Sequence, residues 1–226
     1  MARVELGIDS ASHEAAVALL DGDDVLAEHR WTVETNYSRE LLGGINTALR
    51  EAGVARAELV AIAVDVGPGG YSSLRSGVAT AQGLALALGV TLAGVSRLET
   101  AAFPHLGGGR TVVAVHEPGG GRGAGAAYAA DGGAPALVEA PRLDELDACL
   151  RAAPRGALWC GELGEELIAA LPDIEGTAVS AAENVRRAAD LVRLARLHEA
   201  YGDPGLVDVM YLRPPPITRP AGTKAN

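Results

Sequence analysis

Lysine is almost absent from this chain of 226 residues. Lys224 is the only lysine, so arginine carries almost all of the positive charge. A Walker-type phosphate loop, the strand lysine of a protein kinase and a Schiff-base lysine each need a lysine within the folded chain. The sequence therefore excludes three common kinds of lysine-dependent chemistry.

Cysteine and clustered histidine are also scarce. Cys149 and Cys160 have no C-x-x-C spacing, which predicts reduced thiols rather than a disulfide framework. The five histidines form no H-x-x-x-H pattern and no close group with cysteine, so a local zinc motif is lacking. No run of about 18 apolar residues could span a bilayer, and the first residues lack a secretory apolar region. We therefore expect a soluble, cytoplasmic protein with no membrane partner.

Aromatic residues make up only 4% of the chain, but hydrophobic residues make up 48%, which is enough for a packed core. A disordered chain would be poorer in leucine, valine and isoleucine. Nineteen basic residues against 29 acidic ones give a formal net charge of −10. Such a surface repels phosphate backbones, so a free-standing nucleic-acid-binding protein is disfavoured.

The first 104 residues contain both strand and helix patterns. Short apolar segments predict strands, Asp21-Gly22-Asp23-Asp24 predicts a hairpin turn, and apolar residues at three- and four-residue steps predict helices. Ser38 is the expected N-cap of the first helix, and Gly53 and Gly89 are the expected C-terminal stops. The expected strands are 3–9, 14–20, 25–32, 59–66 and 90–95, and the expected helices are 38–52, 72–88 and 96–104. Three hairpin-linked strands followed by helical crossovers predict a mixed sheet flanked by helices, the ribonuclease-H-like arrangement.

The second half looks like a smaller, degraded version of the first. It begins after a glycine-rich joint at 106–109, and its expected elements are strands at 111–116, 126–130 and 157–160 and helices at 143–152, 162–171 and 184–200. We therefore predict an α/β protein with an N-terminal lobe at 1–104 and a smaller, divergent C-terminal lobe at 105–212. Residues 213–226 are expected to form a flexible tail, because their prolines disfavour helix and central strand.

Asp9 ends the first predicted strand and is followed by Ser10, Ala11 and Ser12. In two-lobed phosphotransferases of the actin and sugar-kinase class, an acid at this place orients a metal-bound water, and the hydroxyls after it face the phosphates. A carboxylate at the C-terminal end of a strand, beside a turn with exposed N–H groups, suits that task. The alternative is structural, because aspartate commonly accepts hydrogen bonds from the backbone of its own turn.

A glycine-rich turn leads from the fourth predicted strand into helix 72–88, with the sequence Gly67-Pro68-Gly69-Gly70-Tyr71-Ser72-Ser73-Leu74-Arg75. Gly67, Gly69 and Gly70 allow the backbone to approach a ligand or a neighbouring chain, and the helix N-terminus attracts an anion. Arg75 could hold a phosphate, pin a loop or pair with an acid. The third glycine of a dinucleotide fingerprint is missing, and Leu74 stands where a G-x-S-x-G nucleophile elbow needs glycine, so a serine hydrolase is disfavoured.

Small side chains form a stripe on the same predicted helix, at spacings of four, three and four residues: Ser76, Thr80, Gly83 and Ala87. Such a stripe allows another helix to approach at the short end of the usual interaxial range of about 8–10 Å. The partner is either the neighbouring helix of the same lobe or a second subunit. The pattern alone favours neither strongly.

The second lobe lacks an obvious phosphate loop. A second acid followed by glycines is expected after strand 111–116, yet the sequence there reads Val115-His116-Glu117-Pro118-Gly119-Gly120-Gly121. Pro118 removes an N–H that a phosphate could use. The predicted cleft is therefore only half equipped for a nucleotide.

These motifs together resemble the bacterial TsaB (YeaZ) family. The resemblance rests on I-D-S-A-S-H-E-A-A-V-A-L near the start, G-P-G-G-Y-S-S-L-R-S-G, A-Q-G-L-A-L-A at 81–87, G-V-S-R-L-E-T at 94–100 and V-M-Y-L-R-P at 209–214. The first 104 residues match well, and the second lobe matches weakly.

The resemblance implies a two-lobed fold of the actin, sugar-kinase and Hsp70 type (ASKHA). It also implies a role in making threonylcarbamoyladenosine beside the anticodon of tRNA, as the non-catalytic partner of a metal-bearing TsaD subunit and of a TsaE ATPase. ATP and a metal would then belong to the partner subunits, no cofactor to this chain, and tRNA contact would be indirect. Pairing in the family, with TsaD or with itself, uses helices that match 38–52 and 72–88, including Ser76, Thr80, Gly83 and Ala87.

The sequence also departs from the family pattern. G-P-G-S-F-T-G-L-R-x-G is usual in the family, and here Gly70, Tyr71, Ser72 and Ser73 occupy the S-F-T-G places. The second-lobe pattern D-A-R-x-G-E-V-Y is lost between His116 and Tyr128, which puts any inherited contact there in doubt. The histidine metal motif of TsaD is missing, so the chain should not be TsaD itself.

Two enzymatic readings are the alternatives. A small-molecule kinase or ATPase of the same fold would use Asp9 and the Gly67–Gly70 turn. A glycoprotease, an older label for the family, is disfavoured because the sequence presents neither a metal motif nor a serine nucleophile. On the scaffold reading, Asp9, Ser10, Gly67, Gly69, Gly70 and Arg75 are vestigial phosphate-facing residues.

Overall fold

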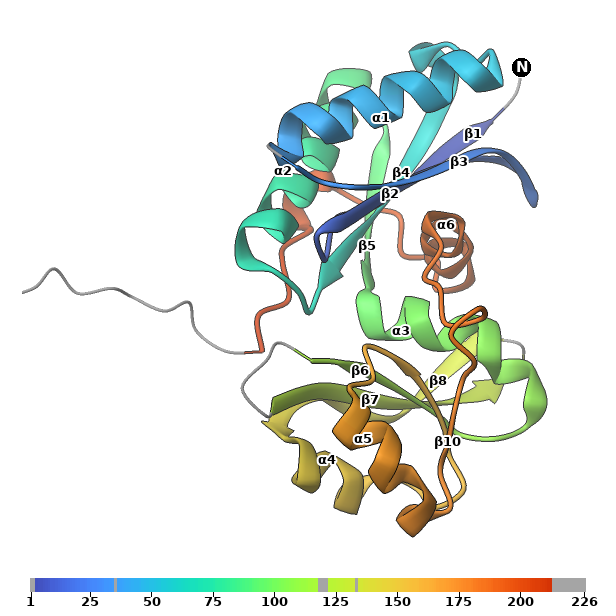
Figure 1. The fold of residues 1–226 in the computed structure, drawn as a ribbon. Helices are drawn as coiled ribbons and strands as arrows, with labels where there is room; N and C mark the ends of the chain where they lie inside the picture. The colour runs from blue at the N-terminus through green and yellow to red at the C-terminus, as the bar shows by residue number, and fades with distance from the viewer. Residues whose placement is uncertain (1–2, 35, 118–121, 133, 213–226) are drawn as a thin grey trace, which may run out of the picture.

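The computed structural model describes residues 3–34, 36–117, 122–132 and 134–212. Two mixed sheets, each with helices packed on its faces, form two lobes that lie one above the other in Figure 1. The predicted two-lobed, ribonuclease-H-like α/β fold is confirmed. The tail predicted for 213–226 lies outside the described residues.

The first sheet has the strand order β3-β2-β1-β4-β5. Its central strand β1 (Val4–Asp9) pairs antiparallel with β2 (Glu14–Asp21) and parallel with β4 (Leu59–Gly67). β3 (Asp24–Thr32) and β5 (Thr91–Ser96) form the edges. The parallel strands β1 and β4 both end at the edge of the sheet that faces the second lobe, which places Asp9 there (Figure 1).

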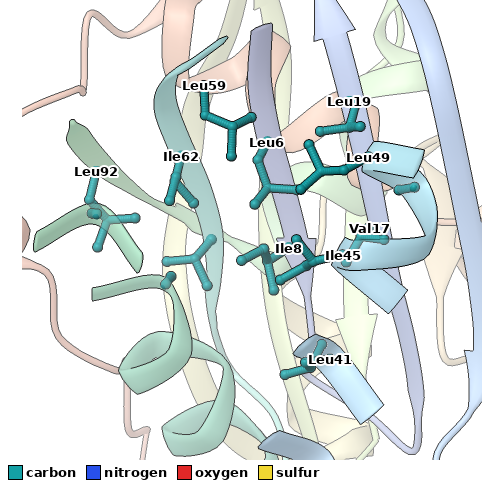
Figure 2. Close-up of a cluster of buried hydrophobic side chains, with 14 of the residues drawn as sticks. Leu6, Ile8, Val17, Leu19, Leu41, Ile45, Leu49, Leu59, Ile62 and Leu92 are labelled. Carbon is teal, nitrogen blue, oxygen red and sulfur yellow. The ribbon is translucent and has the colours of Figure 1, made fainter. Parts of the chain in front are cut away.

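Helices α1 (Tyr37–Ala52) and α2 (Tyr71–Leu88) cover one face of this sheet. Alternate residues of β1 point towards them, so Leu6 and Ile8 pack with Leu41 and Ile45 of α1 in one buried cluster (Figure 2). The helices form where apolar residues recur at helical spacing, as predicted. The predicted N-cap Ser38 is wrong, because the side chain of Asn36 caps α1 by accepting a hydrogen bond from the Arg39 N–H at 3.0 Å. Gly53 and Gly89 end the two helices in the left-handed conformation, as predicted.

The second sheet has the order β10-β9-β6-β7-β8 and repeats the topology of the first. β7 pairs antiparallel with both β6 and β8, whereas β9 pairs parallel with β6 and β10 pairs parallel with β9. The strands are β6 (Val112–His116), β7 (Arg122–Asp131), β8 (Ala134–Glu145), β9 (Leu158–Gly161) and β10 (Thr177–Ala178). β8 and β10 were not predicted, and the helix predicted from residue 143 is wrong at its start, because β8 continues to Glu145. Pairing with β7 makes β8 a strand despite a sequence that lacks clean alternation.

Short helices complete the second lobe. α4 (Leu146–Ala152) and α5 (Glu165–Ala170) lie on its outer face, where the buried cluster includes Trp159 and Leu167. α3 (Arg97–Ala102) lies between the two sheets (Figure 1), and its Leu98 packs against the inner face of the second sheet. α3 therefore connects the cores of the two lobes.

The end of the described chain returns to the first lobe. α6 (Ala188–Leu197) covers the face of the first sheet opposite α1 and α2, and residues 201–212 then run along β5 and α2. α6 starts four residues later than the predicted 184–200, and its apolar face packs against alternate small residues of the sheet, such as Ala18 and Ala63. The predicted range 105–212 for the second lobe therefore includes a segment, 188–212, that packs on the first sheet.

Gly7 sets the distance between α6 and the sheet, because a Cβ atom added there would lie 2.2 Å from the carbonyl oxygen of Ala188. We predict that Gly7→Ala lowers the free energy of unfolding by about 1–3 kcal/mol, since the backbone of α6 would have to move away. Urea unfolding measures this change. The control is Gly43→Ala on α1, where an added Cβ meets nothing within 4 Å and the helix should gain about 0.5–1 kcal/mol. Equal effects of the two substitutions would contradict the prediction.

Candidate functional site

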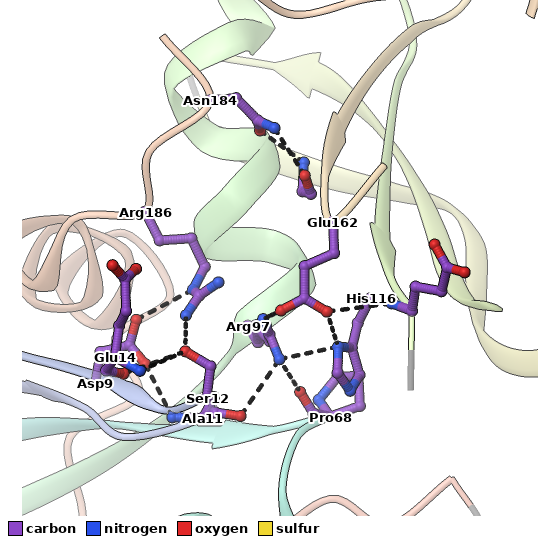
Figure 3. A network of polar contacts seen from close by, with 12 residues as sticks. Asp9, Ala11, Ser12, Glu14, Pro68, Arg97, His116, Glu162, Asn184 and Arg186 are labelled. Carbon is purple, nitrogen blue, oxygen red and sulfur yellow. Dashed lines mark hydrogen bonds and ion pairs between the residues drawn. The ribbon is translucent and has the colours of Figure 1, made fainter. Parts of the chain in front are cut away.

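The candidate site is the cleft between the lobes, where the C-terminal ends of β1 and β4 face those of β6 and β9. Two cavities of about 510 and 370 Å³ lie in this cleft, and Ser12, His13 and Glu162 line both. Three groups of charged side chains lie in or under the cleft (Figure 3). The groups are Asp9 with Arg186, the buried Asp65, and Arg97 with His116 and Glu162. Their charges determine which ligands the cleft can accept.

Asp9 is almost fully buried at the end of β1. One carboxylate oxygen accepts a hydrogen bond from the Ala11 N–H at 3.0 Å, and the other accepts one from Arg186 Nε at 3.1 Å. Burial alone would raise the pKa of Asp9, but the charge of Arg186 and the Ala11 hydrogen bond outweigh it and lower the pKa. Asp9 therefore accepts a hydrogen bond from the backbone of its own turn, which is the structural alternative, and also forms an ion pair with Arg186.

Asp65 lies next to Asp9, on the neighbouring strand β4, and is completely buried. Its Oδ1 accepts a hydrogen bond from the Gly67 N–H at 2.7 Å, whereas Oδ2 has no partner within the described part of the chain. Burial and the negative charge of Asp9 raise the pKa of Asp65 to about 7. Below about pH 7 the two neighbouring carboxyl groups therefore favour opposite protonation states.

Arg97, at the start of α3, joins the two lobes. Its side chain is only 2% exposed, and it donates hydrogen bonds to the carbonyl oxygens of Ala11 (3.3 Å) and Pro68 (3.5 Å) in the first lobe. The same guanidinium forms an ion pair with Glu162 and lies 3.0 Å from His116 Nδ1 in the second lobe. Burial would raise the pKa of Glu162, but the contacts with His116 (2.6 Å) and Arg97 lower it to about 2.

The charged groups occupy equivalent places in the two lobes. His116 ends β6 as Asp9 ends β1, and Glu162 follows β9 as Asp65 lies near the end of β4. Because the sheets repeat one topology, these four residues lie at corresponding strand ends, and Figure 3 shows Arg186 beside Asp9 and Arg97 beside His116 and Glu162. The positive and negative charges therefore neutralise one another within the chain.

The glycine-rich turn closes against the turn after β1. A Cβ atom added at Gly69 would lie 2.2 Å from the Ala11 carbonyl oxygen, which explains why this position needs glycine. The Gly70 N–H, at the N-terminus of α2, donates to the same oxygen at 3.1 Å. Gly69 and Gly70 both line the larger cavity.

Four of the six predicted phosphate-facing residues line neither interlobe cavity, and Asp9, described above, is one of them. Ser10 is completely buried and donates from its hydroxyl to the Ser73 carbonyl oxygen of α2 at 3.1 Å. Gly67 is buried, its N–H donates to the Asp65 carboxylate, and its carbonyl oxygen accepts a hydrogen bond from the Ser96 hydroxyl at 3.5 Å. Arg75 lies on the surface, 4.5 Å over the Tyr71 ring, and donates from Nε to the Tyr211 hydroxyl at 2.7 Å. Arg75 therefore pins the chain near Tyr211, which was one of the alternatives left open by the sequence.

The residues of the cleft do not fit a magnesium-bound nucleotide. The Arg186 guanidinium places a positive charge beside the Asp9 carboxylate, where a cation would otherwise bind. The Gly70 N–H, which could serve a phosphate, is donated to the Ala11 carbonyl oxygen. Among the described residues, no group of three or more His, Cys, Asp and Glu side chains could hold a metal ion.

The stripe of small residues lies on α2, away from the cleft. Ser76 and Thr80 are half-buried, and Gly83 and Ala87 are exposed. The Thr80 hydroxyl donates to the Ser76 carbonyl oxygen at 2.7 Å, and an added Cβ at Gly83 would meet nothing within 4 Å. Gly83 is therefore not covered by any described part of the chain.

Arg97, Arg186, Asp65 and Glu162 were not identified from the sequence. Asp65 gives a signal, because it is the only charged residue in the otherwise apolar strand Leu59–Gly67. Arg186 gives none, since it pairs with an aspartate 177 residues earlier and only the returning α6 segment brings the two together. Tyr128, the expected match to a family tyrosine, is buried in β7 and does not line the interlobe cavities.

Comparisons with known proteins agree with this geometry. A family model described as "TsaD: tRNA N6-adenosine threonylcarbamoyltransferase" matches residues 31–116. The TsaB proteins of Bacillus subtilis (strain 168) and Escherichia coli (strain K12), each described as a "tRNA threonylcarbamoyladenosine biosynthesis protein", are 35% and 32% identical to the chain over 97 residues. These alignments cover 43% of this chain and 42% of each relative, so the chain spans well under half the length of the curated relatives that it matches.

A solved structure matches nearly the whole chain. It is that of an uncharacterized Pseudomonas aeruginosa protein "with similarity to peptidase YEAZ", with a TM-score of 0.79 and 25% identity, covering 93% of this chain and 100% of that one. Two lobes built on repeated mixed sheets around a central cleft define a protein of the ASKHA class. The chain is therefore similar in sequence to TsaB proteins over part of its length, and similar in fold to the YeaZ-like structure over nearly all of it. Separately, no described helix is long and apolar enough to cross a membrane.

The buried Asp65 predicts an unusual dependence of stability on pH. In the unfolded chain Asp65 ionises near pH 4, whereas in the folded protein it keeps its proton up to about pH 7. The folded state binds the extra proton between these values, so the contribution of Asp65 to stability falls as the pH rises from 4 to 7. We predict that Asp65→Asn gains stability relative to the natural chain between pH 5 and pH 8, on the order of 2–3 kcal/mol.

Urea unfolding at the two pH values measures this difference. Asp131→Asn at the exposed end of β7 removes the same charge from the surface and serves as the control, with no expected change between the two pH values. A stability difference for Asp65→Asn that stays constant from pH 5 to pH 8 would show that Asp65 is ionised throughout.

Proposed function

We propose that this chain acts in tRNA threonylcarbamoyladenosine biosynthesis as a non-catalytic subunit that binds and activates a TsaD-like transferase subunit. The names of the TsaB relatives and the TsaD family model support the pathway. The observation that carries the non-catalytic role is the cleft itself, in which Asp9 and Glu162 are paired with arginines of the same chain. The transfer chemistry, with its ATP and metal, then belongs to the partner subunits.

The proposed docking surface is the outer side of α1 and α2. Gly83 and Ala87 allow a close approach of a partner helix, and Leu42 and Leu86 are 43% and 68% exposed beside them. A groove of about 220 Å³ between the helices is lined mainly by apolar side chains: Leu42, Ile45, Asn46, Leu49, Arg56, Leu59, Leu84 and Leu88. An exposed apolar groove next to small residues is suited to helix–helix docking.

In the absence of the TsaD-like subunit, the same surface pairs two copies of this chain. A TsaE-like ATPase is the third member of the proposed complex. The acidic chain contacts tRNA only through its partners, since its net charge of −10 repels a phosphate backbone.

Gly83→Leu tests the docking surface. The substitution leaves the isolated chain folded, because the added side chain meets no atom within 4 Å at its Cβ, but it overfills a close helix–helix contact. We predict that it weakens binding to the TsaD homologue of the same organism at least about tenfold, as measured by isothermal titration calorimetry.

The matched control is Gly107→Leu, which adds the same side chain at a position that also has open space, in the segment after α3. It should bind the TsaD homologue like the natural chain. An unchanged dissociation constant for Gly83→Leu would place the interface elsewhere, and failure of the natural chain to bind would contradict the proposed function.

Calorimetry with magnesium and ATP tests the alternative enzymatic role. On the scaffold proposal, the isolated chain binds no nucleotide at micromolar concentrations, because Arg186 and Ala11 already use the groups that a nucleotide would need. Micromolar binding that is abolished by Asp9→Ala would instead support a kinase or ATPase.

A further inference from the structure

Strand β3 is the most open of the four outer strands of the two sheets, which are β3, β5, β8 and β10. Gly202 exchanges two backbone hydrogen bonds with Leu92 of β5, β8 contains Pro135 and Pro141, and β10 has only two residues. β3 has nine residues, none of them proline or glycine, and among the described strands it pairs only with β2. Its outer side therefore presents a row of backbone groups to which a further strand can bond.

The hydrogen bonds to β2 determine which backbone groups of β3 point away from the sheet. The Val33 N–H donates to the His13 carbonyl oxygen at 2.8 Å, and the antiparallel register is regular over residues 27–32. In such a ladder, pairs of residues that bond to each other alternate with pairs whose N–H and C=O groups point outwards. Counting back from Val33, the backbone groups of Arg30 and Glu28 point outwards.

These two residues carry opposite charges and are both exposed. Their side chains lie on the same face of the sheet, since they are two positions apart on one strand. The Glu28 carboxylate accepts a hydrogen bond from the Ala189 N–H at 3.2 Å, and Arg30 donates to Glu14 at 3.3 Å. A carboxylate and a guanidinium each form several hydrogen bonds, so both side chains can take a further partner.

The order of these charges makes β3 complementary to a second copy of itself. When two β3 strands pair antiparallel about a two-fold axis at His29, Glu28 of each copy lies directly opposite Arg30 of the other copy. An axis at Glu28 or at Arg30 would instead place two like charges opposite each other, which is destabilising. Charge complementarity therefore favours a second copy of this chain as the occupant and specifies the register of the pair.

We propose that β3 pairs antiparallel with β3 of a second copy of this chain, in the register centred on His29. The first sheets of the two copies then form one continuous sheet. The outward N–H and C=O groups of Glu28 and Arg30 bond across the axis, and their side chains form two equivalent ion pairs. This edge is distinct from the outer side of α1 and α2, so the inference does not depend on the proposed function.

Sedimentation velocity of the Gly83→Leu chain over a range of concentrations tests the proposal. This substitution blocks a close approach at the surface of α1 and α2, so a dimer that persists uses another interface. We expect a reversible equilibrium between monomer and dimer at micromolar concentrations. A chain that stays monomeric throughout this range would overturn the proposal.

Charge reversal identifies the interface. In the Gly83→Leu background, Glu28→Arg and Arg30→Glu each place like charges opposite each other and should weaken the dimer at least about tenfold. An equimolar mixture of the two variants restores both opposite-charge pairs and should form heterodimers, which native mass spectrometry detects. Asp131→Arg, at an exposed position of β7, is the control and should leave dimerisation unchanged. A mixture that associates no better than the separate variants would contradict the register.

Hydrogen exchange on the Gly83→Leu chain, with β3 unaltered, provides a measurement that needs no substitution at the edge. The amides of Glu28 and Arg30 should exchange at least about tenfold more slowly at a concentration where the dimer prevails than at one where the monomer prevails. The amides of the outer strand β8 should not change. Equal exchange of Glu28 and Arg30 at both concentrations would show that any dimer forms elsewhere and would overturn the proposal.

Discussion

The pairing of buried charges between the lobes is the interaction on which this structure depends. Arg97 is almost completely removed from water and is stabilised only because carbonyl oxygens of one lobe and the Glu162 carboxylate of the other surround it. Arg186 forms an ion pair with the buried Asp9 carboxylate in the same way. Each guanidinium needs its partner in place, so the two lobes are held in one arrangement by charges that neither lobe could bury alone.

The same pairing occupies groups of the cleft that a phosphate or a metal ion would otherwise contact. The fold brings strand ends, a glycine-rich turn and the N-terminus of α2 together, which is a good setting for a phosphate. Here the turn is bonded to the β1–β2 connection, and the acids are bonded to arginines. A cleft with polar groups that are satisfied within the chain is stable without a bound ligand.

Much of the fold could be predicted from the sequence, and the successes and failures have physical causes. The first lobe was predicted well because its strands are nearly continuous apolar runs and α1 has a clear helical period. β8 was missed because it lacks clean alternation and depends on β7, and the boundary of the second lobe was misplaced because no local pattern announces that α6 returns to the first sheet. Gly69 and Gly70 line the larger cavity, whereas Asp9, Ser10 and Arg75 line neither cavity, since sequence spacing does not fix the direction of a side chain. The ion pairs of Asp9 and Glu162 join residues 177 and 65 positions apart, and only the tertiary fold can specify such pairs.

The return of α6 to the first sheet has a consequence for biosynthesis. The second lobe is inserted between β5 and α6, so the first sheet is still bare on one face when its five strands have left the ribosome. The inserted lobe can form its own sheet during this interval, but Ala18, Ala63 and Ala93 stay exposed to water until Leu197 has been added. The N-terminal lobe therefore cannot finish folding until nearly the whole polypeptide has been synthesised. A nascent chain whose synthesis stops within the second lobe exposes this hydrophobic face of the first sheet to chaperones.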